Sequence, residues 1–588
     1  MRSWLLGCLA VVSALACSGS KPPTPSTPPH AAALEPRPVV VALVVDQLSA
    51  WVAEERVPEL PKDGFFAQMI REGTWAKRMR YPYAITDTAP GHAALHSGKT
   101  PNESHILVNE NPDDKTGVRT SYFRDPATRL VDASGVRSDL VGSSARALAV
   151  PTVADRLREA SPKAKIVSVS LKDRAALLPA GQRPDHAIWF DPAVDSFVTS
   201  TAIESTMPAW AASLGGHEAV KKARASGWTL LDRDWVASHA GKDDAPGEGD
   251  LLGMGTTFPH PVTNARSFRA TPLPDPMILD MALAAVRAER VESQPFLLLV
   301  SLSSSDIIGH TFGASSWESW DHLRRLDREL ARFLRELLAI APGARVILSG
   351  DHGNSAIPEA RGGCKAGERV IAGDPYERPC GGGGRIIPDV LRDEVREEVA
   401  KAIGRADAVA GVSDGYVFLS AEGRALDASK RATIAAAIAR VLAEKHAGTV
   451  EAVFDVNELA AKCPAELAKS VGSPRRALAN AEALFTLVCR SWAPDAGAGD
   501  FYIVPAHGSY FDGEIVPGKG GSHGSPWIYD RTVPLFVRGP GIAAGVTFTD
   551  PVDFTAYSAL EAAFLDLDPF LGFERRSPGD VLDAARAR

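Results

Sequence analysis

The stretch PVVVALVVD, residues 38–46, is an apolar run rich in β-branched residues that ends in an aspartate. A strand without polar positions has no face suited to solvent, so this pattern is typical of a parallel sheet whose two faces are both covered. In such sheets, the side chains that do chemistry gather where the strands end. Asp46 therefore marks the sheet edge at which a functional site is expected.

Four further runs share this composition and are expected to be strands of the same sheet: 166–170, 296–300, 346–349 and 533–537. The proline at position 534 predicts an edge position or a strand start for the last of them. Amphipathic helices lie between the runs, most clearly at 321–341, where leucines recur on one stripe. The alternation predicts an α/β fold with a mostly parallel central sheet sandwiched by helices.

The segment 386–505 differs from the rest and is interpreted as an inserted cap. It contains a charged helix at 390–403, a short strand at 415–419 and a second helix at 430–445, followed by a loop-rich stretch. We therefore expect one catalytic domain over 38–588 that carries this insertion.

The first residues predict export from the cytoplasm. Arg2 precedes a short apolar run and small residues up to Cys17, so residues 1–17 have the architecture of a signal peptide. The sequence before Cys17 resembles a bacterial lipobox, in which Cys17 would be acylated and anchor the protein to a membrane. Plain cleavage after Ala16 is the alternative. Residues 18–37 are rich in proline and serine and predict an extended tether, which suits an enzyme of the periplasm or cell envelope.

Four cysteines lie beyond the signal region, and an exported protein can form disulfides from them. The sequence alone does not fix the pairing. Short separations favour Cys364 with Cys380 and Cys463 with Cys489. A zinc site is the competing interpretation, but no Cys-x-x-Cys spacing supports it.

The charge composition gives no sign of a nucleic-acid partner. The formal net charge is −8 over 588 residues, and no run of five or more basic residues occurs. The isolated arginine pairs are therefore interpreted as solvated surface charges.

Acidic residues and histidines follow the ends of several predicted strands. They are Asp46, Asp306, His310, Asp351, His352 and His523. A single one of these could be a helix cap or a structural histidine. Three aspartates and three histidines at equivalent positions form a mixed oxygen and nitrogen set that suits zinc. Six ligands exceed the needs of one tetrahedral ion, so we expect two zinc ions about 4 Å apart, a spacing that serves in-line displacement at phosphorus.

The stretch ITDTAPGHAALH, residues 85–96, predicts a turn into a helix that starts near Pro90. A hydroxyl at Thr88 would lie at the positive end of that helix, where an alkoxide costs less and an anion is attracted. A neighbouring zinc ion would deprotonate it at neutral pH. The alternative is that Thr88 is only the helix N-cap. His92 and His96 are expected to pack and to support the ligands, because six ligands already fill two sites.

In combination, these motifs resemble the alkaline phosphatase superfamily. The resemblance rests on these motifs, in this order along the chain: Asp46, the Thr-x-Thr-x-Pro-Gly-His form around Thr88, Asp306-x-x-Gly-His310, Asp351-His352-Gly353 and Gly-x-His523-Gly. The chain is most similar to the bacterial phosphate-irrepressible alkaline phosphatases, which use a threonine nucleophile and are related to nucleotide pyrophosphatase/phosphodiesterases. The resemblance implies one zinc held by Asp306, His310 and His523, and another held by Asp46, Asp351 and His352, with Thr88 as nucleophile and ligand between them.

The segment SLKDRAALLP, residues 170–179, is similar to the segment that supplies a lysine and an arginine to the phosphoryl oxygens in the monoesterases of this family. The resemblance therefore assigns substrate binding to Lys172 and Arg174, and also to Asn109. A phosphate monoester is a dianion with three non-bridging oxygens, so it gains more from two cations and an amide than a diester does. The alternative is that both cations are surface charges.

The expected function is hydrolysis of small phosphate monoesters by an exported two-zinc enzyme through a covalent phosphothreonine. A phosphodiesterase or nucleotide pyrophosphatase is the nearest alternative, and Lys172 and Arg174 count against it. A sulfatase is disfavoured because no C/S-x-P-x-R pattern stands at Thr88. A phosphoglycerate-mutase-like enzyme or a phosphonate hydrolase is a more distant option. A catalytically inactive, surface-tethered binding protein would be expected to have lost a ligand or the nucleophile, and all seven residues are present.

Overall fold

The structure is a computed structural model that describes residues 38–113, 116–362, 364–365, 368–470, 483–512 and 515–567. The predicted signal peptide and tether, including Cys17, lie outside these residues. Within the described ranges, no helix combines the length and apolar character needed to cross a membrane.

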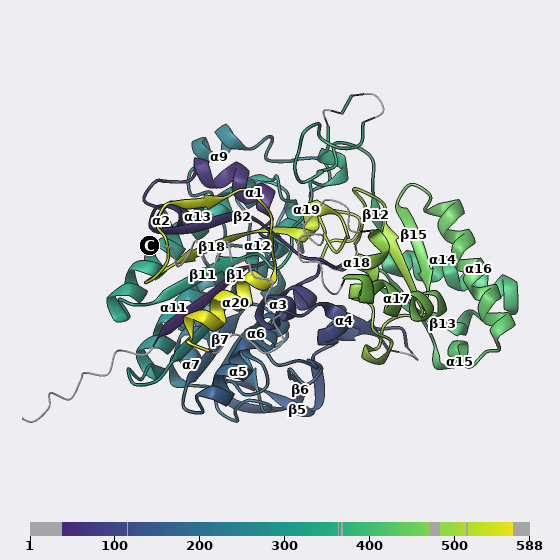
Figure 1. The fold of residues 1–588 in the computed structure, drawn as a ribbon. Coiled ribbons are helices and arrows are strands. Elements are labelled where there is room, and N and C mark those ends of the chain that lie inside the picture. Colours follow the sequence, from purple (N-terminus) through teal and green to yellow (C-terminus); the bar gives the residue numbers. More distant parts are fainter. Residues whose placement is uncertain are drawn as a thin grey trace, which may run out of the picture. The chain divides into compact units, whose positions relative to one another are not determined.

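A sheet of twelve strands forms the centre of the fold (Figure 1). Its middle consists of β11 (Arg345–Ser349), β1 (Val39–Val45), β10 (Phe296–Leu302) and β7 (Lys165–Ser170), which run parallel to one another. All seven residues of β1 are buried. The predicted α/β fold with a mostly parallel centre is confirmed, and the carboxyl ends of β1, β10 and β11 meet at one edge.

Strand β18 (Thr532–Arg538) contains Pro534 but does not lie at an edge of the sheet. It pairs antiparallel with β11 on one side and with β2 (Gly73–Arg80) on the other. The predicted edge position is therefore wrong. The register against β2 shifts between Val533 and Leu535, on either side of Pro534. This irregularity accommodates Pro534, which has no backbone N–H to donate to the neighbouring strand.

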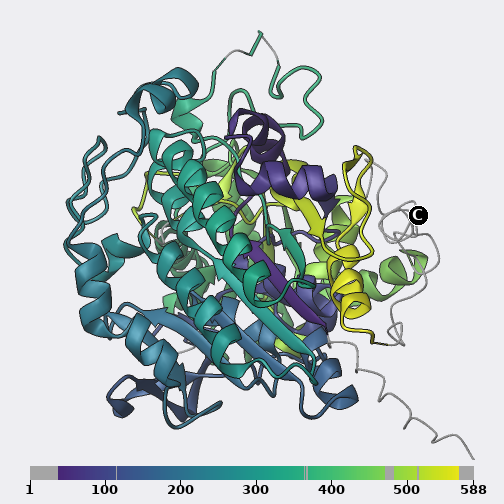
Figure 2. The ribbon, with the colours of Figure 1, turned by 90° about the vertical axis from the view of Figure 1, so that its left-hand side faces the viewer.

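Helices cover both faces of the sheet, and alternate residues of β1 pack into two separate hydrophobic cores, one on each face. One face carries α11 (Pro274–Glu289) and α13 (Trp317–Ile340), which is the helix predicted at 321–341 (Figure 2). The other face carries α6 (Asp173–Ala180) and α20 (Thr555–Phe564). Burial on both faces explains why β1 has no polar position.

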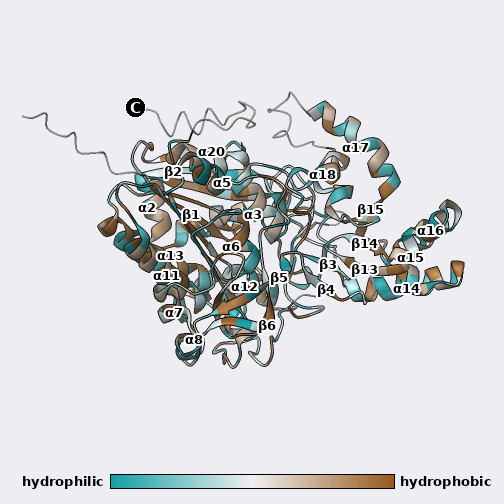
Figure 3. Cartoon of the chain, turned by 90° about the horizontal axis from the view of Figure 1, so that it is seen from below, coloured by the Kyte–Doolittle hydropathy of each residue, from teal (hydrophilic) through white to brown (hydrophobic). Residues whose placement is uncertain are grey.

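The segment interpreted as a cap builds a second, smaller sheet. One hydrophobic cluster lies within and directly after this segment, and a second cluster also includes residues 84–85 and 107–108. Its elements are α14 (Pro388–Ile403), β13 (Val409–Ser413), β14 (Tyr416–Leu419), α16 (Ala428–Lys445), β15 (Val450–Asp455) and β16 (Phe501–Pro505). Helices α14 and α16 show both polar and apolar residues in Figure 3, as expected for helices that cover one face of a sheet. The domain boundaries and the role as a cap stay predictions.

Both expected disulfides are present. Cys364 pairs with Cys380, and Cys463 pairs with Cys489. The pairing suits a protein that folds in an oxidising compartment.

Candidate active site

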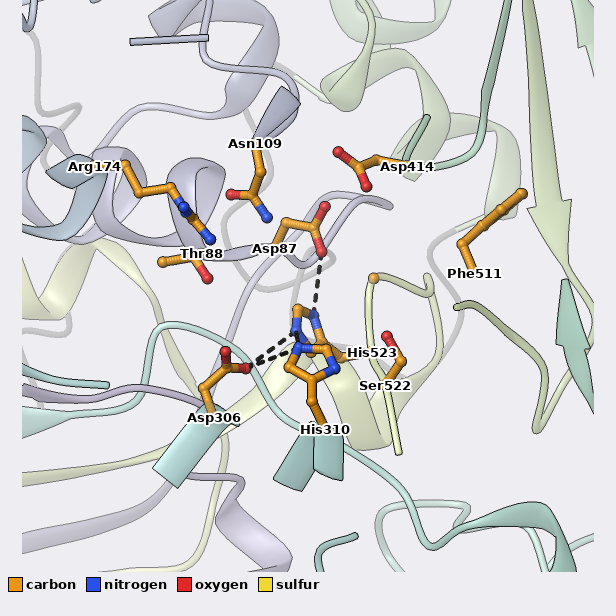
Figure 4. Close-up of a pocket in the computed structure, with 11 residues that line it drawn as sticks. Asp87, Thr88, Asn109, Arg174, Asp306, His310, Asp414, Phe511, Ser522 and His523 are labelled. Carbon is orange, nitrogen blue, oxygen red and sulfur yellow. Dashed lines mark hydrogen bonds and ion pairs between the residues drawn. The ribbon is translucent and has the colours of Figure 1, made fainter. Parts of the chain in front are cut away.

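Thr88 is the first residue of α3 (Thr88–Ser97), two residues earlier than the start predicted near Pro90. The N-cap is Asp87, so Thr88 is not the cap of this helix. Thr88 is buried, and its hydroxyl lies at the positive end of the helix and lines a pocket (Figure 4). An oxygen at this position is stabilised as it gains negative charge.

Asp306, His310 and His523 form the first triad of possible metal ligands. Asp306 and His310 are one turn apart on α12 (Ser304–Phe312), which follows β10, and His523 comes from the loop before α19 (Ile528–Arg531). The Asp306 Oδ1 atom lies 3.3 Å from Nε2 of each histidine, and the two Nε2 atoms are 3.2 Å apart. Figure 4 shows the three side chains pointing toward one another.

Asp46, Asp351 and His352 form the second triad, at the carboxyl ends of β1 and β11. The Nε2 atom of His352 lies 3.4 Å from Oδ1 of Asp46 and 3.5 Å from Oδ2 of Asp351. All three side chains are fully buried. The parallel pairing of β1 with β11 explains why residues about 305 positions apart converge here.

Both triads fit a bound cation. Within each, the ligand atoms of all three residues lie within 4.8 Å of one another. In the second triad, Oδ1 of Asp46 and Nε2 of His352 are buried and make no hydrogen bond. Buried polar atoms without partners are costly, and a cation would satisfy them. Carboxylate oxygens and imidazole nitrogens are donors that zinc accepts.

Lys172 links both triads to Thr88. Its Nζ lies 2.6 Å from Oδ2 of Asp306 and 2.8 Å from Oδ2 of Asp46, and it donates a hydrogen bond of 3.0 Å to Thr88 Oγ1. Burial alone would lower the pKa of Lys172, but the carboxylates of Asp306 and Asp46 outweigh it and raise the pKa above its ordinary value. The ammonium group is therefore charged at neutral pH and close to the expected nucleophile.

Asn109 and Arg174 lie in the same pocket as Thr88. The Oδ1 atom of Asn109 accepts a hydrogen bond of 2.9 Å from the Ala89 backbone N–H, which turns its amide nitrogen toward the pocket (Figure 4). Arg174, in the first turn of α6, points to the same space. The structure thus brings together the ten residues that the sequence singled out for catalysis and metal binding, because Asn109, Lys172, Arg174 and Thr88 adjoin the two triads.

Two supporting residues were not predicted. Gln47 donates from its backbone to Asp351 Oδ1 at 3.0 Å and from its side chain to Asp306 Oδ1 at 2.7 Å, so it bridges the triads. Asp87 lies 3.2 Å from His523 Nδ1, the nitrogen opposite the ligand atom. Residues that orient a metal ligand in this way have no sequence motif of their own. The sequence shows only that Gln47 is a polar residue next to Asp46, and that Asp87 is one next to Thr88.

Of the two histidines on α3, His92 contacts a triad residue and His96 packs against α20. His92 Nδ1 lies 3.1 Å from Asp351 Oδ2, and His96 Nδ1 lies 3.1 Å from Glu561 Oε2. Neither belongs to a triad. Burial would raise the pKa of Asp351, but His352 and His92 outweigh it and hold the pKa well below its ordinary value. Asp351 is therefore ionised, as a metal ligand must be.

The smaller sheet also contributes to the pocket. Asp414, in the turn between β13 and β14 of this sheet, lines the pocket. Phe511, in β17 (Tyr510–Phe511) of a separate two-stranded sheet, and Ser522 line it as well. Figure 4 shows Asp414 and Phe511 on the side away from Arg174. Sequence reasoning did not identify these residues, because none of them is a candidate metal ligand or nucleophile at the end of a predicted strand.

The fold and the motifs at its sheet edge define a member of the alkaline phosphatase superfamily. More closely, the chain belongs to the type I phosphodiesterase / nucleotide pyrophosphatase family, whose model matches residues 40–526.

Several individual proteins are similar over much of the chain. Alkaline phosphatase PafA of Elizabethkingia meningoseptica is 34% identical over 367 residues, which cover 60% of this chain and 64% of PafA. Alkaline phosphatase PhoK of Sphingomonas sp. is 26% identical over 86% of this chain and 84% of its own length. A Myroides odoratus protein named calcium-transporting ATPase is 29% identical over 87% of this chain and 89% of its own.

The crystal structure of PafA superposes with a TM-score of 0.74 at 25% identity, covering 91% of this chain and 97% of PafA. A second crystal structure of PafA carries substitutions of a threonine, an asparagine, a lysine and an arginine, and matches equally well.

Proposed function

We propose that the protein is an exported two-zinc phosphatase that hydrolyses phosphate monoesters through a covalent phosphothreonine at Thr88. The observation that carries the proposal is the position of Lys172, whose ammonium group contacts Thr88 and a carboxylate of each triad. Together with Arg174 and Asn109, it supplies the donors that a dianionic phosphoryl group needs.

One zinc ion would be held by Asp306, His310 and His523, and the other by Asp46, Asp351 and His352, with Thr88 between them. When bound, such ions supply Lewis-acid stabilisation of charge that develops on oxygen.

In the first step, Thr88 Oγ1, after losing its proton to solvent, attacks phosphorus in line, the Oγ1–P bond forms, the bond from phosphorus to the ester oxygen breaks, and the leaving alkoxide takes a proton from water. Lys172 and the start of α3 stabilise the negative charge on Oγ1. Arg174 and the amide group of Asn109 bind the non-bridging oxygens, so the phosphoryl group is held while it is transferred. In the second step, water attacks the phosphothreonine, which releases phosphate and restores Thr88.

The substituted PafA structure supports this assignment of residues. Its threonine and asparagine are separated as Thr88 and Asn109 are here, and its lysine and arginine as Lys172 and Arg174 are. All four types also stand in the same order.

A phosphodiesterase or nucleotide pyrophosphatase is the second candidate, because that activity names the family whose model matches. It would use the same triads and Thr88, but its substrate would have a second organic group on phosphorus. The two candidates are distinguished by whether the site accepts the second organic group of a diester.

The test is kcat/KM of the zinc-loaded protein for p-nitrophenyl phosphate and bis-p-nitrophenyl phosphate, measured side by side. We expect the monoester to be preferred by at least about a hundredfold, since two cations and an amide face a dianion. A diester preference would reject the monoesterase and support the second candidate. Activity on neither ester would reject both and support an inactive binding protein.

We further propose that the protein is exported and tethered through a lipidated Cys17. Both disulfides support export. Cell fractionation of the full chain and of Cys17→Ala tests the anchor. We expect the full chain in the membrane fraction and the variant in the soluble envelope fraction, and equal distributions would contradict lipidation.

A further inference from the structure

The segment 81–87, which connects β2 to α3 and leads directly to Thr88, forms neither helix nor strand. All of its residues are buried, so its backbone N–H groups need partners within the protein. Its first residue is held from the end of α19, because the N–H of Tyr81 donates a hydrogen bond of 2.8 Å to the Arg531 carbonyl. The position of Thr88 then depends on what holds the middle of the segment.

The side chain of Ser491 holds the middle of this segment. Its Oγ accepts a hydrogen bond of 2.8 Å from the N–H of Ala84 and one of 3.1 Å from the N–H of Ile85. A hydroxyl oxygen has two lone pairs, so these two bonds use its full accepting capacity. Ser491, Ala84 and Ile85 are each at most 1% exposed, so water has no access to replace the hydroxyl. Next to Ser491, the Arg490 guanidinium donates to the Pro82 carbonyl at 3.1 Å.

Ser491 belongs to the inserted segment and is itself firmly held there. It ends α18 (Leu484–Ser491), and its carbonyl accepts a hydrogen bond of 2.7 Å from the hydroxyl of Tyr416 in β14. Two residues earlier, the buried Cys489 forms the disulfide with Cys463. The smaller sheet and a disulfide therefore fix the helix end that holds the segment before Thr88.

We propose that Ser491 is a positioning residue for Thr88, so that the inserted segment holds the nucleophile in place as well as lining the pocket. Ile85 lies three residues before Thr88. Without the hydroxyl, two buried N–H groups lose their acceptor, and the segment must shift to find others. The inference rests on the proposed function, since it assumes that Thr88 attacks phosphorus.

The first experiment compares Ser491→Ala with Ser491→Thr, which keeps the hydroxyl, at matched zinc content. In Ser491→Ala, kcat for p-nitrophenyl phosphate should fall about tenfold or more, because a nucleophile displaced by about 1 Å reacts far more slowly. The inhibition constant of inorganic phosphate should change by less than about threefold, since Lys172 and Arg174 still bind the phosphoryl oxygens. Ser491→Thr should restore most of the wild-type kcat.

The matched control is Ser420→Ala in the same inserted segment. Ser420 is also buried, and its Oγ accepts a backbone hydrogen bond of 3.0 Å from Gly423 within α15 (Ala421–Arg424). Its loss should lower Tm, as the loss of the Ser491 hydroxyl should, but leave kcat unchanged. Equal losses of kcat in both alanine variants would overturn the proposal, as would a Ser491→Ala protein with the wild-type kcat or a Ser491→Thr protein that restores nothing.

Amide hydrogen exchange of a peptide that spans 81–92 gives a second readout, which needs no turnover. We expect faster exchange in Ser491→Ala than in the wild type or in Ser420→Ala, since the N–H groups of Ala84 and Ile85 lose their acceptor. Unchanged exchange would overturn the positioning role. A wild type without phosphatase activity would instead reject the proposed function, and the exchange rates would still decide whether Ser491 holds the segment.

Should Ser491→Ala fail to fold, Tyr416→Phe replaces it. This variant removes the hydroxyl that binds the Ser491 carbonyl and keeps the aromatic ring in its hydrophobic cluster. We expect faster exchange of the peptide 81–92 and a loss of kcat of about threefold, as one net hydrogen bond would give. Wild-type exchange and wild-type kcat in this variant would contradict the proposal.

Discussion

Replacing Lys172 and Arg174 together by alanine should reduce hydrolysis of monoesters far more than hydrolysis of diesters. Lys172 is buried and lies 3.0 Å from Thr88 Oγ1, and Arg174 lines the same pocket. Both cations therefore face the place where the phosphoryl oxygens must sit. A monoester offers them three non-bridging oxygens and two negative charges, and a diester offers two oxygens and one charge.

The magnitude follows from the strength of charge-assisted hydrogen bonds. Each is worth about 1.5–3 kcal/mol, so the loss of two weakens transition-state binding of a monoester by ~3–6 kcal/mol. At 1.4 kcal/mol per factor of ten, kcat/KM for the monoester should fall roughly 10²–10⁴-fold. A diester with one charge should lose about half of that free energy, or roughly 10–10²-fold in kcat/KM. The monoester preference should therefore drop at least about tenfold.

The assay is kcat/KM for p-nitrophenyl phosphate and its bis-ester, with zinc content measured on the same samples, because Lys172 also contacts two triad carboxylates. The control is Arg183→Ala, which removes an exposed cation three residues beyond α6. It should leave both values unchanged. Equal losses for the two esters at full zinc occupancy would refute the assignment of these cations to the dianion.

Three further outcomes are expected. Thr88→Ala should lower turnover by about 10³-fold or more while zinc content stays the same, since the triads remain intact; turnover near the wild-type rate would reject Thr88 as nucleophile. Asp87→Asn should weaken zinc binding about tenfold in a chelator competition, because the Asp87 carboxylate lies 3.2 Å from His523 Nδ1. The loss should be no larger, because the Thr86 carbonyl lies 2.8 Å from the same nitrogen and still orients the ring. Equal zinc affinities of variant and wild type would show that the Thr86 carbonyl alone is enough to orient His523. Burial raises the pKa of Asp327 to about 6, above its unfolded value of about 3.9, so ionisation costs folding free energy as pH rises through this interval. Asp327→Asn should therefore stabilise the protein by roughly 2–3 kcal/mol at pH 8 and have little effect at pH 4 in urea unfolding, and the same difference at both pH values would contradict the shift.

The sequence predicted the centre of the fold well because burial on both faces leaves a strand without polar residues. β1 is the clearest case, with every position buried. Strands that contain polar side chains lack this signal. β2, with the sequence GTWAKRMR, is mostly buried but contains a lysine and two arginines, and β6 (Gly135–Ser143) has only two buried residues, so neither strand was predicted. β18 was recognised, but its internal position was not, because a register shift at Pro534 cannot be read from one strand alone.

The candidate ligands were also predictable, since parallel strands end at a common edge. The supporting contacts were not, because they depend on pairs far apart in the chain. Gln47 reaches Asp306 and Asp351 across about 260 and 304 positions. Asp414 enters the pocket from a hairpin of the smaller sheet, whose placement has no local signature.

The glycine of the Thr-Ala-Pro-Gly-His stretch shows how Thr88 and the second triad are positioned together. A Cβ atom on Gly91 would lie 2.3 Å from the Asp351 carbonyl oxygen, so only glycine lets α3 approach this closely. The same approach places His92 beside the Asp351 carboxylate at 3.1 Å. On the other side of the helix start, Asn109 holds the Ala89 N–H. The turn at Thr88 is thus fixed on one side by the close approach of Gly91 to Asp351 and on the other by the hydrogen bond from Ala89 to Asn109, and Lys172 contacts its hydroxyl.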